Sequence, residues 1–162
     1  MIFQREILTI LSGAAPISEV RGAIPLGMFF FGFYPLKAYS LAVLGNALPV
    51  LPILFFLDRF SVFMMKRFYF FNRFFTWLFD YTRRRHGDHF HYWKWAPLAL
   101  FVFVAIPLPL TGAWSGALAA FIFGISFWRA ALAIFLGILV AGAIVLALTL
   151  LGIFTFNSAY FL

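Results

Sequence analysis

The uncharged stretch from Trp95 to Trp128 constrains this chain more than any other feature. As one continuous α-helix it would be about 50 Å long, whereas the hydrocarbon core of a bilayer is about 30 Å thick. The stretch must therefore break. Its breaker is the segment IPLPLTGAWSG, in which Pro107 and Pro109 each remove a backbone donor and Gly112 and Gly116 loosen the chain. We expect two half-helices joined by a turn.

The composition identifies the environment of this chain. Of its 162 residues 65% are hydrophobic and only 10% are charged, whereas a soluble domain is nearer a quarter charged. No soluble fold of this size could bury 25 Phe, 6 Tyr and 5 Trp together with the aliphatic runs. We therefore expect one integral membrane domain. The formal charge of +7 gathers beside apolar segments, which favours membrane topology over nucleic-acid binding.

Two segments have the length of full crossings, Ala38–Leu57 and the run from Ala130 onward. Before the first of them, Ile2–Leu11 predicts a short helix, Gly13–Ser18 a breaker and Glu19–Phe31 a returning helix. Each half of the chain is thus expected to be a re-entrant helical hairpin followed by one transmembrane helix. The N-terminus resembles a signal peptide, but its apolar run is too short and too interrupted for one, so we expect it to be retained.

The two halves show an internal repeat. Without any gap, Phe31–Gly45 aligns with Phe123–Gly137, placing Lys37 over Arg129. The same register places Glu19 over Thr111; chance similarity of two apolar segments is the alternative. Because each half enters and leaves on one side and then crosses once, the halves are expected to have inverted topology, as in many secondary transporters.

Between the halves lies a basic segment in which charged residues recur every seven positions, at Arg59, Lys66, Arg73 and Asp80. This pattern predicts an amphipathic helix in the membrane interface; a third crossing is the alternative, disfavoured by its charges. The segment, with the further basic run RRR, is expected in the cytoplasm and both termini outside. The domain is accordingly divided into repeat 1 (about 2–57), an interfacial linker (58–94) and repeat 2 (about 95–156).

Glu19 and Arg21 are the strongest functional candidates, because ionisable residues at membrane depth are expensive and therefore rare. Two residues apart on a helix, they are not expected to face each other well, so one or both should find a partner or substrate across the repeat interface. The alternative is structural, with Ser18 and Glu19 capping a half-helix and Arg21 binding a backbone carbonyl.

Their counterparts in the second half are Thr111, Gly112, Trp114 and Ser115, where a half-helix N-terminus would favour an anion. Trp114 either stacks on a ligand or packs in the core, and Asn46 either lines the cavity or bonds to a neighbouring helix. No metal site is expected, since His86, Asp88, His89 and His91 match no ligand template. The chain has no catalytic motif, so we expect neither enzyme activity nor a cofactor.

The motifs PISEVRGAIPLG and FVAIPLPLTGAWSGALAA, with Gly45 and Asn46 between them, resemble the family of small multidrug export proteins over roughly residues 10–150. A departure is Leu110, where a small residue is expected. The family is distantly similar to DedA-like membrane proteins, which have re-entrant hairpins and are linked to lipid-carrier transport. The resemblance implies a bacterial inner-membrane protein. The motif positions it carries over are Pro16, Glu19, Arg21, Pro25, Gly27, Pro107, Pro109, Thr111, Gly112, Trp114 and Gly116.

The function expected from these observations is export of a small molecule, with Glu19 as a proton-binding carboxylate and Arg21, Asn46, Thr111, Gly112 and Trp114 around the substrate. The alternatives are a flippase for a polyprenyl-phosphate lipid and a membrane assembly module that transports nothing. The expected partners are membrane lipid, a small or lipidic substrate and a second copy of the chain, since one short chain encloses little space.

Overall fold

The structure of the chain is a computed structural model that describes residues 2–67, 92–108 and 111–160. These residues form helices and connecting loops without any strand, which confirms the expected all-α fold. The helices are α1 (Ile2–Ala14), α2 (Glu19–Pro25), the π-helix η1 (Leu26–Phe30), α3 (Pro35–Ala47), α4 (Val50–Arg67), α6 (Tyr92–Ala105), α7 (Ala113–Ile122) and α8 (Phe127–Tyr160).

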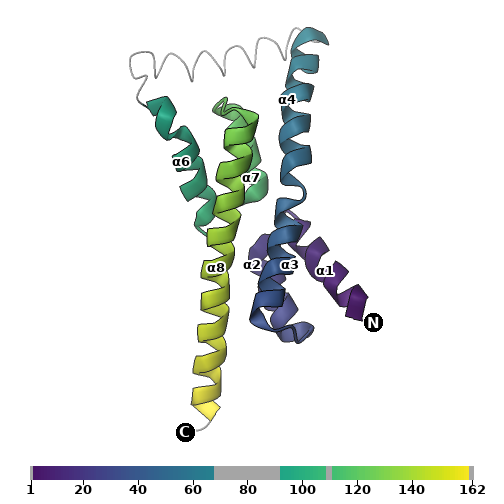
Figure 1. Ribbon diagram of the computed structural model, residues 1–162, viewed down its shortest axis with the longest axis vertical. Coiled ribbons are helices and arrows are strands. Elements are labelled where there is room, and N and C mark those ends of the chain that lie inside the picture. Colours follow the sequence, from purple (N-terminus) through teal and green to yellow (C-terminus); the bar gives the residue numbers. More distant parts are fainter. Residues whose placement is uncertain (1, 68–91, 109–110, 161–162) are drawn as a thin grey trace.

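Two long helical columns run through the molecule in opposite directions: α3 followed by α4, and α8 (Figure 1). The first column is interrupted between α3 and α4, where Pro49 cannot donate a backbone hydrogen bond. Pro35–Arg59 and Phe127–Ile153 are long and apolar enough to cross a bilayer. The two segments expected to cross are therefore found as candidate spans.

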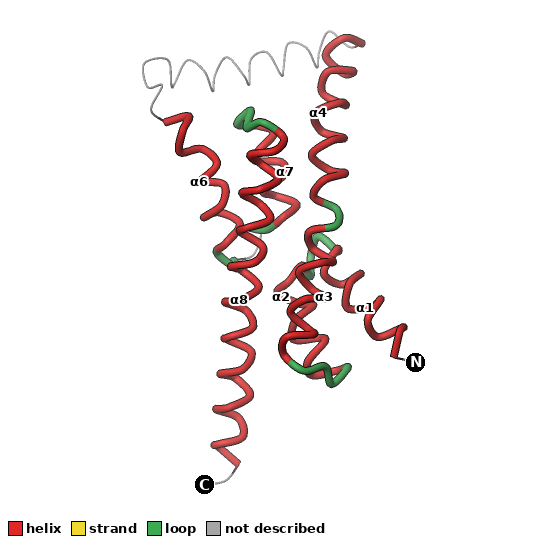
Figure 2. Tube along the Cα trace, in the orientation of Figure 1, coloured by secondary structure: helices red, strands yellow, loops and turns green. Residues whose placement is uncertain are grey.

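Each column is preceded by a pair of short helices that we name the first hairpin (α1 and α2, continued by η1) and the second hairpin (α6 and α7). In Figure 1, α1 and α6 approach the middle of the molecule from opposite ends, and α2 and α7 lead away again. The loops that lead into α3 and α8 accordingly lie at opposite ends (Figure 2). We name residues 14–21 the first tip and residues 106–108 and 111–114 the second tip; both tips lie near the middle of the molecule (Figure 1).

The register that aligns Phe31–Gly45 with Phe123–Gly137 also aligns the first residue of α3, Pro35, with the first residue of α8, Phe127. Gly45 and Gly137, which this register pairs, both permit a close helix contact. A Cβ on Gly45 would lie 2.2 Å from the Ile10 carbonyl oxygen, and one on Gly137 would lie 2.7 Å from Val104 Cβ. Each long helix thus packs against the incoming helix of its own hairpin at a glycine, as membrane helices often do.

The buried core lies where α2, α7 and α8 meet, and it consists mainly of small and aliphatic side chains, among them Ile24, Ala117 and Ile134. Large apolar side chains on the outside are strongly exposed, for example Phe30 (79%) and Trp128 (77%). Such a surface is stable only when another apolar medium covers it. The fold therefore presents its apolar exterior to lipid.

The expected boundary between repeat 1 and the linker, after Leu57, is not marked by a helix end, because α4 continues to Arg67. Lys66 therefore belongs to the same helix as part of the candidate span. The remainder of the predicted interfacial helix, including Arg73, Asp80 and the basic run at 83–85, lies outside the described residues, and its orientation stays a prediction.

Candidate functional site

Glu19 begins α2 in an unusual backbone conformation. Its φ is 48°, in the left-handed region that non-glycine residues rarely adopt, and its side chain is buried. The residue before it, Ser18, makes no capping hydrogen bond; its hydroxyl lies 2.7 Å from that of Ser12 instead. The sequence-based alternative of a Ser18 cap is therefore not supported. The strained conformation turns the Glu19 carboxylate away from its own helix end and toward the second hairpin.

Glu19 and Arg21 form an ion pair in which Arg21 Nη2 donates to Glu19 Oε2 at 2.9 Å. The expectation that these residues do not face each other was wrong. It assumed regular helical geometry for both residues, whereas the positive φ of Glu19 brings its side chain alongside that of Arg21. The exposed fractions are 4% for the Glu19 side chain and 22% for the Arg21 side chain, so the acid is enclosed and the base is partly open.

Arg21 also reaches the second hairpin, because its Nη1 donates to the backbone carbonyl of Leu108. That carbonyl lies in the broken segment between α6 and α7, which contains Pro107. Thr111 organises the same turn: its hydroxyl is 2.6 Å from the Ile106 carbonyl oxygen and accepts the Leu108 N–H at 3.1 Å. Thr111 thus acts on the turn that presents the Leu108 carbonyl to Arg21.

Gly112, the residue before α7, lies directly against the Glu19 carboxylate. A Cβ on Gly112 would be 1.7 Å from Glu19 Oε2 and 2.3 Å from Oε1, so no side chain fits there while Glu19 keeps its position. An N-cap side chain usually occupies this place and interacts favourably with the helix N-terminus. The carboxylate of the first hairpin therefore stands where the N-cap side chain of α7 would be.

Trp114 provides a third contact between the tips. Its indole Nε1 donates to the carbonyl oxygen of Ala14, at the end of α1, at 3.1 Å. This contact ties the indole to the first hairpin, and Ser115 instead serves its own helix, accepting the Gly112 N–H at 2.9 Å. Among the described residues, three contacts therefore join the two tips: Arg21 with Leu108, Glu19 with Gly112, and Trp114 with Ala14.

Asn46, near the end of α3, is buried, with only 1% of its surface exposed. Its Oδ1 has no hydrogen-bond partner. Two roles were predicted for Asn46, lining a cavity and bonding to a neighbouring helix. The oxygen Oδ1 lines no described cavity and accepts no hydrogen bond from the described residues of a neighbouring helix, so neither role is supported for it. It is an unsatisfied acceptor close to the tips.

The remaining motif positions shape the hairpins. Pro16 lies in the first tip and Pro107 in the second, while Pro25 ends α2 immediately before η1. The two remaining motif glycines, Gly27 and Gly116, allow close packing. A Cβ on Gly27 would lie 3.1 Å from Ala38 Cβ, and one on Gly116 would lie 2.6 Å from Val104 Cγ2. Pro109 and Leu110 are outside the described residues, so the effect of the bulky Leu110 is untested.

Metal binding finds no support in the part of the chain that the structure describes, which holds no group of three or more His, Cys, Asp or Glu. The predicted exclusion of His86, Asp88, His89 and His91 concerns residues outside that part. Sequence reasoning considered a backbone carbonyl as an alternative partner of Arg21, and the structure identifies that carbonyl as Leu108. The Ala14 carbonyl was not considered, because a backbone acceptor leaves no mark in a sequence pattern.

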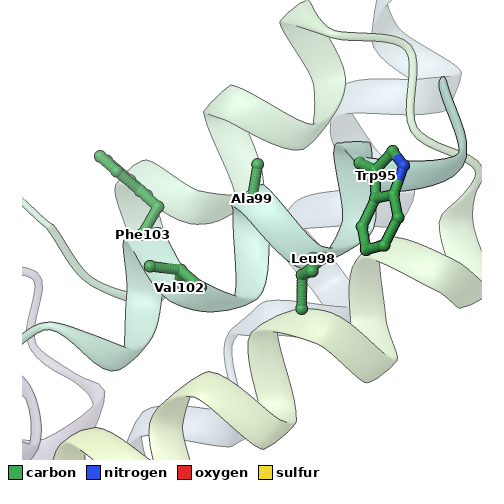
Figure 3. Close-up of a pocket in the computed structure, with 5 residues that line it drawn as sticks. All are labelled: Trp95, Leu98, Ala99, Val102 and Phe103. Atoms are coloured by element: carbon green, nitrogen blue, oxygen red, sulfur yellow. The ribbon is translucent and has the colours of Figure 1, made fainter. Parts of the chain in front are cut away.

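A separate pocket lies along α6 (Figure 3). Its walls are formed by Trp95, Leu98, Ala99, Val102 and Phe103. These side chains are apolar except for the indole N–H, and four of the five residues are among the exposed large hydrophobics. The pocket therefore has the character of a lipid-facing surface.

Comparison with known proteins agrees with the motifs. The model of one family, described as putative small multi-drug export protein, matches residues 19–144, from the ion pair to the middle of α8. No curated protein and no solved structure matches the chain. The match begins at Glu19 and includes Arg21, Asn46, Gly112 and Trp114, all of which lie at or near the meeting point of the tips. The chain is a membrane protein that belongs to the family of putative small multi-drug export proteins.

Proposed function

We propose that the chain is a small membrane exporter in which the contact between the two tips closes the pathway and Glu19 couples its opening to protons. The observation that carries this proposal is the enclosed carboxylate of Glu19, paired with Arg21 and placed against Gly112 of the other hairpin. An ionisable pair at membrane depth is expensive and is usually kept for function.

In the proposed arrangement the hairpins are re-entrant and the halves form an inverted repeat. The opposite directions of the two columns, the opposite approaches of α1 and α6, and the shared register of α3 and α8 support this arrangement. Broken helices that meet near the midplane are typical of transporters built in this way.

The proposed topology places the linker in the cytoplasm and both termini outside, in the inner membrane of a bacterium. The basic run at residues 83–85 supports this orientation. Reporter fusions after Arg85 should be cytoplasmic and fusions after Leu162 external. Finding both reporters on one side of the membrane would contradict the inverted arrangement.

Protonation of Glu19 provides the coupling in this proposal. The ionised carboxylate attracts Arg21 and the positive end of α7, and both attractions lose their charge term when a proton binds. Neutral Glu19 therefore holds the tips together less strongly. Proton binding from one side of the membrane would open the pathway, and release to the other side would close it.

The experiment that tests this function uses protein in liposomes with an imposed proton gradient and a cationic dye as substrate. The wild type should transport the dye only with the gradient, and Glu19→Gln should lose that dependence. Transport by Glu19→Gln with unchanged proton dependence would refute the coupling. A double variant, Glu19→Gln with Arg21→Gln, that folds and transports normally would refute the site.

A second candidate is a flippase for a polyprenyl-phosphate lipid, favoured by the partial exposure of Arg21, since guanidinium groups bind phosphate well. The same liposomes distinguish it by a labelled polyprenyl phosphate, whose movement should be abolished by Arg21→Gln. A module that only assembles with other proteins would tolerate both substitutions. Neither candidate involves a cofactor or an enzymatic step, and each is compatible with a homodimer.

A further inference from the structure

Asn46 differs from the other buried polar residues of the described chain. Thr9 and Thr149 donate to the carbonyls four residues before them, at 2.9 Å and 2.8 Å, and Glu19 pairs with Arg21. Asn46 Oδ1 alone is an unsatisfied buried side-chain atom. A buried acceptor without a hydrogen bond lowers the free energy of unfolding, so it needs an explanation. One explanation is a second state of the protein in which a donor reaches this oxygen.

The packing places Asn46 at the level of the tips. Gly13, beside the first tip, lies so close to α3 that a Cβ on it would be 3.3 Å from the Asn46 backbone nitrogen. The helices α2 and α3 run in opposite directions, and η1, which continues α2, touches α3 where Gly27 meets Ala38. Equal lengths of chain lead from this contact to Glu19, at the start of α2, and to Asn46 on α3, so both residues lie toward the same end of this helix pair, near the tips.

Helix packing by itself does not require an amide at this position. The register that pairs Gly45 with Gly137 pairs Asn46 with Ile138, which is equally buried at 1% exposed and wholly apolar. The polar group thus occurs only in the half that carries Glu19. Because only the half with Glu19 carries an amide at this position, we relate the Asn46 amide to the Glu19 carboxylate and not to the helix packing that both halves have in common.

Arg21 and Trp114, two donors at the tips, have acceptors other than Asn46. Arg21 donates to Glu19 and Leu108, and Trp114 donates to Ala14. An ionised carboxylate has no proton to donate, whereas a protonated one carries an O–H donor. Protonation of Glu19 therefore creates a donor at the tips, near which Asn46 lies, and, in the same step, removes the charge that holds the carboxylate to Arg21.

We propose that Asn46 Oδ1 accepts a hydrogen bond from protonated Glu19, so that the carboxyl group moves from Arg21 and Gly112 to Asn46 when a proton binds. No covalent bond of the chain changes: one proton from the solvent binds the carboxylate and leaves it again. Asn46 is a positioning residue in this scheme, which rests on the proposed proton-coupled function.

Arg21 is the charged side chain recorded in contact with Glu19. The other described charged residues on the helices packed against α2 lie toward helix ends: Arg5 and Glu6 on α1, Lys37 on α3, and Arg129 on α8. Glu6 and Lys37 pair with each other at 2.5 Å. The pH response of the tips is therefore expected to follow Glu19.

The test is infrared difference spectroscopy of the full chain in liposomes during a pH titration. The band of a protonated carboxyl group that is absent in Glu19→Gln belongs to Glu19. In Asn46→Leu this band should shift to higher frequency, because the hydrogen bond is lost. Asn46→Ala, which needs less space, provides the same measurement if Asn46→Leu does not insert.

Thr9→Val is the matched control, since it also removes a buried polar group but leaves Asn46 in place; its band should be unchanged. An unshifted band in the Asn46 variants would refute the hydrogen bond while leaving proton binding by Glu19 intact. A wild-type spectrum without any Glu19 carboxyl band would refute both the hydrogen bond and the proposed proton coupling.

Discussion

The two tips share a frame but differ in chemistry. The first contributes side chains, namely the carboxylate of Glu19 and the guanidinium of Arg21, whereas the second contributes the Leu108 carbonyl and the bare Cα of Gly112. The difference shows how two hairpins can build one asymmetric contact, with the charged side chains on one hairpin and the space for the carboxylate on the other.

The largest effect on stability should come from removing the base and not the acid. Arg21→Gln leaves the enclosed carboxylate without its ion-pair partner and should lower the free energy of unfolding by about 3 kcal/mol. Glu19→Gln leaves the partly exposed Arg21 and should lower it by less than about 1 kcal/mol. Thermal unfolding in detergent at neutral pH measures both, and equal losses would contradict the unequal burial of the pair.

The next effect concerns the space at the second tip. Gly112→Ala places a methyl group in the position of the Glu19 carboxylate and should lower the free energy of unfolding by about 2 kcal/mol. The extended backbone of Gly112, with φ of −160°, is open to any residue, so the loss would be steric. Gly152→Ala, where a Cβ meets nothing within 4 Å, is the control.

A double-mutant cycle sharpens this prediction. In a Glu19→Ala background the carboxylate is gone, so Gly112→Ala should have almost no further effect on thermal unfolding. An undiminished loss in that background would show that the methyl group clashes with something other than Glu19.

Asn46→Leu should stabilise the protein, in contrast to the substitutions above. Replacing an unsatisfied buried amide by an apolar side chain of similar size should raise the free energy of unfolding by about 1 kcal/mol while impairing proton-coupled transport. The matched substitution Ile138→Asn should destabilise the protein, because it creates a second buried amide. A loss of stability in Asn46→Leu would instead indicate a structural role for the amide.

The smallest effect is expected for Trp114→Phe, which keeps an aromatic ring but loses the hydrogen bond to the Ala14 carbonyl. Thermal unfolding should report a loss of about 0.5 to 1 kcal/mol. Trp128→Phe, at an exposed position, should change little. No difference between the two variants would mean that the third contact contributes nothing to holding the tips together.

The sequence predicted the frame well because the relevant physics is local. Apolar length determined where helices could cross, and Pro107 fell between helices as expected. Of the first breaker, residues 15–18 fell between helices, whereas Gly13 belongs to α1. The site was predicted only as a set of residues. The pairing of Glu19 with Arg21 depends on a left-handed backbone conformation at Glu19, which no sequence pattern predicts. The contact of Glu19 with Gly112 depends on how two tips far apart in the sequence pack together.

The sequence does carry one sign of the contact between Glu19 and Gly112. Gly112 is the N-cap residue of α7, a position at which Ser, Thr, Asp or Asn is more usual. A glycine at that place indicates either a tight turn or a group arriving from elsewhere. Here the Glu19 carboxylate arrives from the first hairpin. A glycine at the N-cap of a broken membrane helix can therefore indicate that a charged side chain from another hairpin occupies the place of the N-cap side chain.

The most direct test of the account measures the distance between the tips as Glu19 is protonated. The chain has no cysteine, so spin labels can be attached to Ile17→Cys and Leu108→Cys, two exposed tip positions. Pulsed electron paramagnetic resonance in liposomes should give a short distance at neutral pH and a longer one after acidification, and the longer one at both pH values when Glu19→Gln is added. A distance that stays the same in all four samples would contradict the claim that ionised Glu19 holds the tips together.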